Sequence, residues 1–388
     1  MKTWIALFLA AALLLAPYPI VRAAELEVSA PSAILMDAAT GSILYEKNAH
    51  QQLAPASVTK VMTLLLVMEA LDNGQISWDD KVTASDAAAA KGGSQIYLEP
   101  GEQLSMDEML KSVVVSSAND CATALAEHVA GSEADFVRRM NDRAAELGLE
   151  DTHFVNCTGL DDEPEAAQHL TSAHDLAVMS RELLRHDRIK DYTTIWMDTV
   201  RDGKFGLSNT NKLVRFYDGT TGLKTGYTSA AGHCLAASAK RDGMELIAVV
   251  LHCSSSTDRF ESAKALLNYG FGNYALVNIE PNEPLSPLPV SLGVQPLLTP
   301  VLQQSAPILI EKHELSRISK TIDLPEGLKA PIAQGQQLGT MTICAGDQTL
   351  AQIPIVASSS VDRLSLWQLT TRILRRLCMA APEESGIH

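Results

Sequence analysis

The sequence has little positive charge and, beyond its N-terminus, no long apolar run. Its 31 Lys and Arg residues are outnumbered by 46 Asp and Glu residues, and the net charge at pH 7 is −15. Because phosphates bind to basic surfaces, this balance argues against a nucleic-acid partner. After residue 23 no segment reaches the roughly 18 apolar residues of a membrane-spanning helix, so no such helix is predicted.

Metal-binding motifs and closely spaced cysteine pairs are also absent from the sequence. It contains neither C-x-x-C nor H-E-x-x-H, so no metal or other cofactor is predicted. Several cysteines lie in apolar runs, as Cys121 does, which favours buried free thiols, although an exported protein could also form disulfides. The six cysteines are Cys121, Cys157, Cys234, Cys253, Cys344 and Cys378.

The N-terminal segment has the features of a secretory signal. Lys2 precedes an uncharged run over residues 4–17 that is rich in Leu and Ala, and Val21 and Ala23 occupy the positions that determine cleavage. We therefore predict a signal peptide over residues 1–23, cleaved after Ala23. An uncleaved N-terminal anchor is the alternative, but the apolar run is short for one. The mature protein is expected to lie outside the cytoplasmic membrane.

The 388 residues are enough for two domains. The order of turns and apolar runs predicts an α/β (α+β) domain over residues 24–275, in which helices flank an antiparallel sheet. Asp242-Gly243 is a typical hairpin turn between two of its strands. The predicted elements are a hairpin over 33–47, a helix over 58–71 with Ser57 in its first turn, a helical region over 106–184, strands over 222–226, 234–240 and 245–252, and a helix over 259–269.

The composition changes after residue 275. Prolines separate short runs of Val, Leu and Ile that lack helical periodicity, which predicts a small all-β, sandwich-like domain over residues 276–357. A disordered linker is the alternative, but apolar runs such as 308–310 favour a packed core.

Residues 361–379 are predicted to form an amphipathic helix. Its wide apolar face, which includes Leu366 and Trp367, lies opposite a face that carries Arg372 and Arg375. Such a helix is typical of a segment that lies in a membrane interface. The alternative is a helix docked on the core of the protein itself.

Three short strings follow one another along the chain: Ser57-Val58-Thr59-Lys60, Ser117-Ala118-Asn119 and Lys224-Thr225-Gly226. A serine hydroxyl is a poor nucleophile unless a neighbour takes its proton. Residues three apart on a helix share a face, which brings Lys60 beside Ser57. Burial and the charge of Lys224 are expected to lower the pKa of Lys60 from its usual ~10.4, so that its amine can act as a base.

The other two strings supply groups that such a base and its substrate need. Ser117 can pass a proton to a leaving amine, and Asn119 can bind both Lys60 and a substrate amide. Lys224 and Thr225 can bind a carboxylate, while Gly226 lets an extended peptide approach as an added strand. Taken singly, the strings are equally typical of helix caps and of a surface strand with an exposed lysine. Together they predict a serine acyl-transfer enzyme.

With these motifs the sequence resembles the low-molecular-mass penicillin-binding proteins, specifically the D-alanyl-D-alanine carboxypeptidases of the serine β-lactamase-like superfamily. The motif surroundings carry the likeness further, over residues 55–60, 116–120 and 218–227, and over Arg259 with residues 266–271. The resemblance implies a β-lactamase/transpeptidase-like catalytic domain, a small β domain and a membrane-anchoring C-terminal helix. It also implies an exported enzyme at the outer face of the bacterial cytoplasmic membrane.

The resemblance further implies the reaction and the roles of single residues. Ser57 would form an acyl-enzyme with the penultimate D-Ala of a peptidoglycan stem peptide, terminal D-Ala would leave, and β-lactam antibiotics would acylate the same serine. The backbone N–H groups of Ser57 and Tyr227 would form the oxyanion hole, and Arg259 would help to bind the terminal carboxylate.

Three related activities remain as alternatives at this point. A class A β-lactamase would need a glutamate that activates water, usually in a Glu-x-x-Leu-Asn pattern, and the acidic loop over 161–168 lacks that pattern. A transpeptidase or endopeptidase would keep the same strings. So would a sensor that becomes acylated by β-lactams or peptidoglycan and does not release the product.

Overall fold

The computed structural model describes residues 26–162, 164–277, 279–303 and 307–379. The predicted signal peptide and its cleavage position lie outside these residues. Among the helices of the described part, none is long and apolar enough to cross a membrane.

A five-stranded antiparallel sheet organises the N-terminal two thirds of the chain. Its strands are ordered β2-β1-β9-β8-β7, so the hairpin predicted at the N-terminus pairs directly with a strand from more than 200 residues later. The turn at Asp242 and Gly243 has positive φ at both residues, as a two-residue hairpin turn requires. These strands are β1 (Ser32–Asp37), β2 (Ile43–Lys47), β7 (Thr220–Thr228), β8 (Gly232–Arg241) and β9 (Met244–Cys253).

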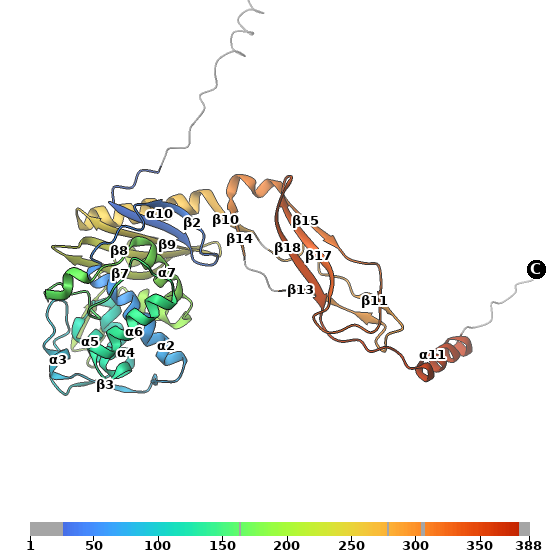
Figure 1. Cartoon of the computed structure of the whole chain (residues 1–388), viewed down its shortest axis with the longest axis horizontal. Helices are drawn as coiled ribbons and strands as arrows, with labels where there is room; N and C mark the ends of the chain where they lie inside the picture. Colours follow the sequence, from blue (N-terminus) through green and yellow to red (C-terminus); the bar gives the residue numbers. More distant parts are fainter. Residues whose placement is uncertain (1–25, 163, 278, 304–306, 380–388) are drawn as a thin grey trace, which may run out of the picture.

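Helices cover both faces of this sheet (Figure 1). Successive residues of β1 point to opposite sides: Ile34 packs in the larger cluster with α2 and α7, whereas Leu35 packs in the cluster with α10. Because both faces are covered, every residue of β1 is buried. The prediction of an antiparallel sheet flanked by helices is confirmed.

The described part of the predicted helical region over 106–184 contains four α-helices, and a longer segment over 147–172 separates the third from the fourth. On the same side of the sheet lie two small antiparallel pairs of strands, β3 with β4 and β5 with β6. The bounds are η1 (Ala56–Thr59), α2 (Lys60–Asp72), β3 (Lys81–Thr83), α3 (Asp86–Ala89), β4 (Gln103–Ser105), α4 (Met106–Val115), α5 (Asn119–Ala130), α6 (Glu133–Glu146), η2 (Pro164–Gln168), α7 (Ala173–Leu184), η3 (Asp187–Ile189), α8 (Lys190–Thr193), β5 (Met197–Val200), β6 (Phe205–Ser208), α9 (Leu213–Phe216) and α10 (Ser256–Asn273).

A second, all-β domain follows α10 and has its own core, which excludes a disordered linker. Buried Met341, Ile343, Ile353 and Ile355 form the centre of that core. Its sheets have the orders β13-β18-β17-β15 and β12-β11-β16, and β10 pairs with β14. The bounds are β10 (Tyr274–Val277), β11 (Leu288–Ser291), β12 (Leu297–Leu298), β13 (Pro300–Leu302), β14 (Ile308–Glu311), η4 (Lys312–Arg317), β15 (Ile318–Asp323), β16 (Leu328–Lys329), β17 (Gln337–Ala345) and β18 (Gln348–Ala357).

The β domain extends beyond the predicted boundary at residue 357, and the C-terminal helix starts later than predicted. Val361 is buried against the β domain and pairs with Ile332, and Arg363 pairs with Gly293. The helix α11 (Leu366–Met379) begins only after these bridges. The apolar side chain of Val361 is therefore used by the β core and not by the helix.

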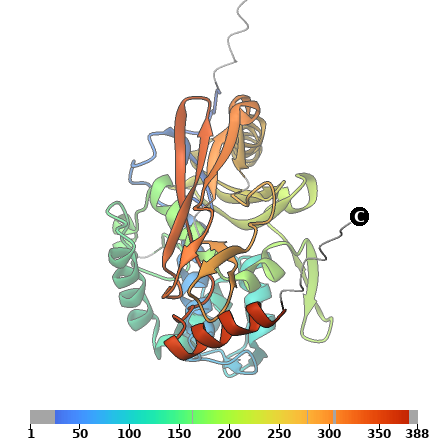
Figure 2. The same ribbon diagram turned by 90° about the vertical axis from the view of Figure 1, so that its right-hand side faces the viewer.

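The β domain lies between the domain of the five-stranded sheet and α11 (Figure 1). Viewed from that end, α11 runs across the tip of the β domain (Figure 2). The helix is thus held at the end of the molecule that is farthest from the five-stranded sheet.

Candidate active site

The three strings predicted to act together come from separate elements that meet beside β7. The Nζ atom of Lys60 lies 3.0 Å from Ser57 Oγ and 2.5 Å from Asn119 Oδ1. The side chains of Lys60, Ser117, Asn119 and Lys224 are all buried, while Ser57 is half-buried. The first two strings are therefore in direct contact.

Ser57 sits on a 3₁₀ turn, η1, that leads into α2, and not on the first turn of a regular α-helix as predicted. In a 3₁₀ turn residues three apart are eclipsed, which brings the Lys60 amine beside the Ser57 hydroxyl. The residues at the cap positions are Pro55 for η1 and Thr59 for α2, and neither caps with its side chain. Ser57 therefore does not act as a helix cap.

Lys60 has three neighbours that suit a neutral amine. Its Nζ also lies 2.8 Å from the carbonyl oxygen of Thr158, so two neighbours can only accept hydrogen bonds and the third is the Ser57 hydroxyl. A neutral amine has two N–H donors for the acceptors and one lone pair for the hydroxyl proton. Burial lowers the pKa of Lys60 to about 7, against an opposing effect of the Asp120 charge.

The second string forms the start of α5. Asn119 Nδ2 donates to the Gly92 carbonyl at 2.7 Å while its Oδ1 accepts from Lys60, so the amide is fixed in one orientation. The cap position of α5 is Ala118, which leaves neither Ser117 nor Asn119 as a cap. Ser117 has a φ of 64°, a conformation uncommon for a residue with a side chain. Such strain is often found at functional sites.

Asp120 follows this string, yet its carboxylate is turned away from Lys60. It accepts hydrogen bonds from the backbone N–H groups of Ile96, Leu98 and Cys121. These bonds hold the loop that contains Gly92 against the start of α5. Asp120 therefore supports Asn119, and within the described residues no carboxylate is bonded directly to the Lys60 amine.

The third string lies on β7, which is an edge strand of the sheet. Lys224 is 1 % exposed, so the alternative of a surface strand with an exposed lysine is wrong. Its Nζ donates to the Thr225 carbonyl at 3.0 Å, and Thr225 Oγ1 donates to Thr210 Oγ1 at 2.6 Å. The pKa of Lys224 lies well below its usual value because of burial and the charges of Lys60 and Arg259.

Burial is the main cause of the lowered pKa of both amines, and repulsion between Lys60 and Lys224 adds to it. That Lys224 helps to lower the pKa of Lys60 stays a prediction.

Gly226 allows β7 to lie directly against the turn that carries Ser57. A Cβ at this position would lie 2.6 Å from the Pro55 carbonyl oxygen and 3.0 Å from the Val58 backbone nitrogen. No side chain fits in that space. The ring of the next residue, Tyr227, is stacked on His233 at 4.3 Å between centroids.

Comparison with known proteins indicates one protein family over most of the chain. Residues 20–255 match the family model described as D-alanyl-D-alanine carboxypeptidase. The chain belongs to this family. Residues 280–363 match the model of the penicillin-binding protein 5 C-terminal domain, which agrees with the end of the β domain in the structure. The predicted family, fold and enzyme class, a serine-type D-alanyl-D-alanine carboxypeptidase, are thereby confirmed.

Individual relatives are similar to this chain over 64–88 % of its length. The chain is 42 % identical over 347 residues to D-alanyl-D-alanine carboxypeptidase DacF of Bacillus subtilis, with 88 % of each chain covered. The crystal structure of penicillin-binding protein 5 from Haemophilus influenzae superposes with a TM-score of 0.71 at 30 % identity, covering 88 % of this chain and 100 % of that one. Penicillin-binding protein D2 from Listeria monocytogenes, solved in its ampicillin-bound form, gives 0.58 at 32 % identity over 64 % of this chain and 99 % of that one.

Arg259 lies behind β7, where it binds main-chain carbonyls. Its Nη1 donates to the carbonyls of Gly226 at 3.0 Å and Cys234 at 3.4 Å. Burial lowers the pKa of this guanidinium from its ordinary value. Its direct role in this structure is to hold β7 and β8, and its binding of a substrate carboxylate stays a prediction.

Three groups at the site were not predicted from the sequence. The Thr158 carbonyl contacts Lys60, the Thr210 hydroxyl contacts Thr225, and His169 contacts Thr59 in the turn that carries Ser57. Thr158 is presented by a tight turn in which Asn156 Oδ1 accepts from the N–H groups of Thr158 and Gly159. An Asn three residues before a Gly is typical of such turns and could have indicated this one. The other two groups carry no local signal.

The five cysteines whose side chains the structure describes are unpaired, and four of them are buried. Burial raises the pKa of each buried thiol, for Cys234 to about 11 and for Cys253 to about 12. These thiols are therefore protonated at neutral pH and act as apolar core residues. Cys378 lies in a part of α11 whose side chains are not described.

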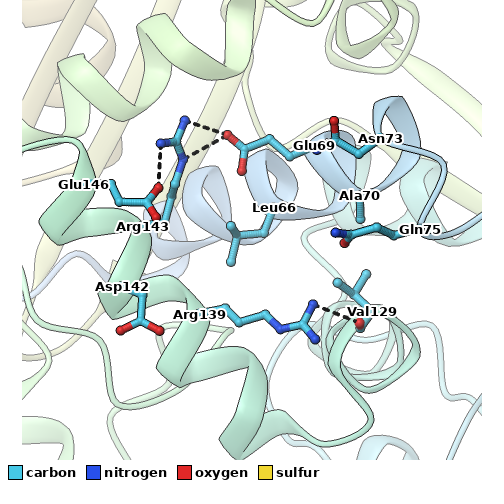
Figure 3. Close-up of a pocket in the computed structure, with 10 residues that line it drawn as sticks. All are labelled: Leu66, Glu69, Ala70, Asn73, Gln75, Val129, Arg139, Asp142, Arg143 and Glu146. Carbon is cyan, nitrogen blue, oxygen red and sulfur yellow. Dashed lines mark hydrogen bonds and ion pairs between the residues drawn. The ribbon is translucent and has the colours of Figure 1, made fainter.

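A pocket of about 550 Å³ lies elsewhere on the catalytic domain (Figure 3). It runs along the C-terminal half of α2, where Arg143 bridges Glu69 and Glu146. None of its lining residues belongs to the three strings, which are grouped around the N-terminal end of α2. This pocket is separate from the site of Ser57.

The rate at which benzylpenicillin acylates the protein is expected to rise with pH and to be half-maximal near pH 7. Lys60 can take the Ser57 proton only as a neutral amine, and its pKa is about 7. Below that pH the rate should fall about tenfold per pH unit. In Asp120→Asn the midpoint should move to lower pH, because the Asp120 charge raises the pKa of Lys60. A midpoint near the usual lysine value would contradict this account.

Gly226→Ala should lower the acylation rate at least about tenfold, because the added methyl group must push β7 away from Pro55 and Val58. The matched control is Gly206→Ala on β6, where a Cβ would meet nothing within 4 Å. Both rates are measured with a fluorescent penicillin. Equal rates in the two variants would show that the close approach of β7 is not required.

Proposed function

We propose that this protein removes the terminal D-Ala from peptidoglycan stem pentapeptides through an acyl-enzyme on Ser57. The observation that carries the proposal is the buried Lys60 amine, 3.0 Å from the Ser57 hydroxyl and with a pKa of about 7. A base with a pKa near the working pH can take a proton and return it.

Acylation begins when neutral Lys60 accepts the Ser57 proton and Oγ attacks the carbonyl carbon of the penultimate D-Ala. The backbone N–H groups of Ser57 and Tyr227 stabilise the oxyanion that forms. When the C–N bond breaks, the leaving amine takes a proton that Ser117 passes on from Lys60. Water then attacks the ester, Lys60 accepts a proton from the water, and Ser57 leaves with that proton to give the trimmed peptide.

The substrate peptide adds as a strand beside β7, which is one of the two edge strands of the sheet. Its terminal carboxylate binds Lys224 and the Thr225 hydroxyl, with help from Arg259. This assignment is supported by the electrostatics of the site, where burial and the charges of Lys60 and Arg259 lower the pKa of Lys224. A bound carboxylate places a negative charge beside Lys224 and so favours the protonated form of that amine.

β-Lactams acylate Ser57 by the same steps, because their ring carbonyl takes the place of the scissile amide. The relative from Listeria monocytogenes with ampicillin bound supports this part of the proposal. No metal or other cofactor enters any step.

We further propose that the protein is exported and lies on the outer face of the cytoplasmic membrane through α11. Leu366 is 85 % and Trp367 80 % exposed, and Ile373 and Leu374 are also exposed, so the helix presents an apolar face that the protein does not cover. On another side of the helix, Arg372 Nη1 donates to the Gly293 carbonyl at 3.0 Å. The alternative of a helix docked by its apolar face on the core is not supported by these exposures.

Ser57→Ala should abolish D-Ala release from a pentapeptide that ends in D-Ala-D-Ala, while the melting temperature stays close to that of the wild type. The products are identified by mass spectrometry. Free D-Ala without a cross-linked dimer supports a carboxypeptidase, a dimer supports a transpeptidase, and a single stoichiometric burst supports a sensor. Equal release by wild type and variant would remove Ser57 from its role.

Removal of residues 366–388 should abolish binding to vesicles that contain anionic lipid and leave D-Ala release from a soluble pentapeptide intact. Trp367→Ser should weaken vesicle binding by about 10- to 150-fold, because burying one large apolar side chain contributes about 1.5–3 kcal/mol. Thr370→Ser is the matched control on the same helix. Undiminished sedimentation of the truncated protein with vesicles would rule out this anchor.

A further inference from the structure

A chain of hydrogen bonds connects buried His169 to the peptide unit that precedes Ser57. Val155 N–H donates to His169 Nδ1 at 3.1 Å. His169 Nε2 lies 2.7 Å from Thr59 Oγ1, and Thr59 Oγ1 donates to the Ala56 carbonyl at 2.8 Å. His169 is 3 % and Thr59 1 % exposed, so water does not compete for these bonds.

The direction of every bond in this chain is determined. Because Nδ1 accepts from a backbone N–H, the proton of a neutral imidazole must be on Nε2. Nε2–H therefore donates to Thr59 Oγ1, whose own proton is left for the Ala56 carbonyl. Burial, with the charges of His153 and Lys60, lowers the pKa of His169 to about 4, so the ring is neutral at physiological pH.

The carbonyl at the end of the chain belongs to the same planar peptide unit as the Ser57 N–H. In a trans peptide the C=O and N–H groups point in opposite directions, so fixing the Ala56 carbonyl also fixes the Ser57 N–H. The unit needs such support, because Ala56 has a φ of 49°. Gly159 closes the other side, where a Cβ would lie 1.8 Å from the Ala56 oxygen.

We propose that His169, acting through Thr59, orients the Ser57 N–H of the oxyanion hole and strengthens it as a donor. A carbonyl that accepts a hydrogen bond polarises its own amide, which makes the N–H of that amide a better donor. His169 and Thr59 are thus positioning residues that do not touch the substrate. The inference rests on the proposed function, because it takes the Ser57 N–H as an oxyanion donor.

The test uses Thr59→Val, which keeps the side-chain shape and removes the hydroxyl. The ester carbonyl of the penicilloyl-enzyme lies in the oxyanion hole, so its infrared stretching frequency reports the strength of that hydrogen bond. We expect the band to move to higher frequency, and the acylation rate to fall about tenfold, a part of the roughly 100- to 1000-fold cost of losing a whole donor. For D-Ala release, kcat should fall while KM changes little.

Three further variants separate positioning from general destabilisation. Thr59→Ser retains the hydroxyl and should recover most of the lost rate. Thr63→Val removes an equivalent bond one helical turn later, from Thr63 Oγ1 to the Cys157 carbonyl at 2.7 Å. It should lower thermal stability comparably and leave the ester band in place. His169→Phe should shift the band as Thr59→Val does, and the double variant should shift it no further, because both residues act through one chain.

An unshifted band with a normal acylation rate in Thr59→Val would overturn the inference. So would equal band shifts in Thr59→Val and Thr63→Val, or additive effects in the double variant. If Thr59→Val does not fold, His169→Phe alone decides by the same band. A wild-type protein that penicillin does not acylate would overturn the proposed function, and this inference with it.

Discussion

The burial of the Lys60 amine, without a directly bonded carboxylate in the described part of the chain, is the constraint on which the site depends. An ion pair would raise the pKa of the lysine and keep its amine protonated, so that the amine could not act as a base. The structure instead surrounds the amine with an amide oxygen, a carbonyl oxygen and the Ser57 hydroxyl. The carboxylate of Asp120, the nearby acidic residue, instead accepts hydrogen bonds from three backbone N–H groups. Neutral acceptors thus fix the position of the amine while its pKa stays low.

Glycines make this arrangement possible, because they let three distant segments touch without side chains between them. Gly226 brings β7 against the Ser57 turn, and Gly159 brings the turn of Thr158 against the Ala56 carbonyl. Gly93 does the same for Asn119, whose Nδ2 would lie 2.8 Å from a Cβ at that position. At Gly226 and Gly159 the close approach is to backbone atoms, so contacts between backbones help to determine how near the three segments lie.

The parts that could be predicted from the sequence are those with a local cause. Asp242-Gly243 can adopt the two positive φ angles of a hairpin turn, and the three strings carry the chemistry of acyl transfer in their side chains. The parts that could not be predicted depend on packing between distant segments. The Thr158 carbonyl is a backbone group with no side-chain signature, and the contact of His169 with Thr59 spans 110 residues. The end of the β domain was predicted too early in the sequence. The apolar side chain of Val361 fits the pattern of the amphipathic helix, and its pairing with Ile332 depends on a distant segment.

The site also lowers the stability of the folded protein, and the pH range of this cost follows from the pKa of Lys60. In the unfolded chain Lys60 has an ordinary pKa near 10.5, whereas in the folded protein it is about 7. Between these values the unfolded chain binds a proton that the folded protein does not. The contribution of this group to folding therefore becomes less favourable as the pH falls through that range. Positive φ angles at Ala56 and Ser117 add strain in the same region. The extensive apolar packing of α2 against its neighbouring helices and the sheet offsets the cost of burying the amine and of the backbone strain. The helix that carries the reactive amine thus also contributes to the core that stabilises it.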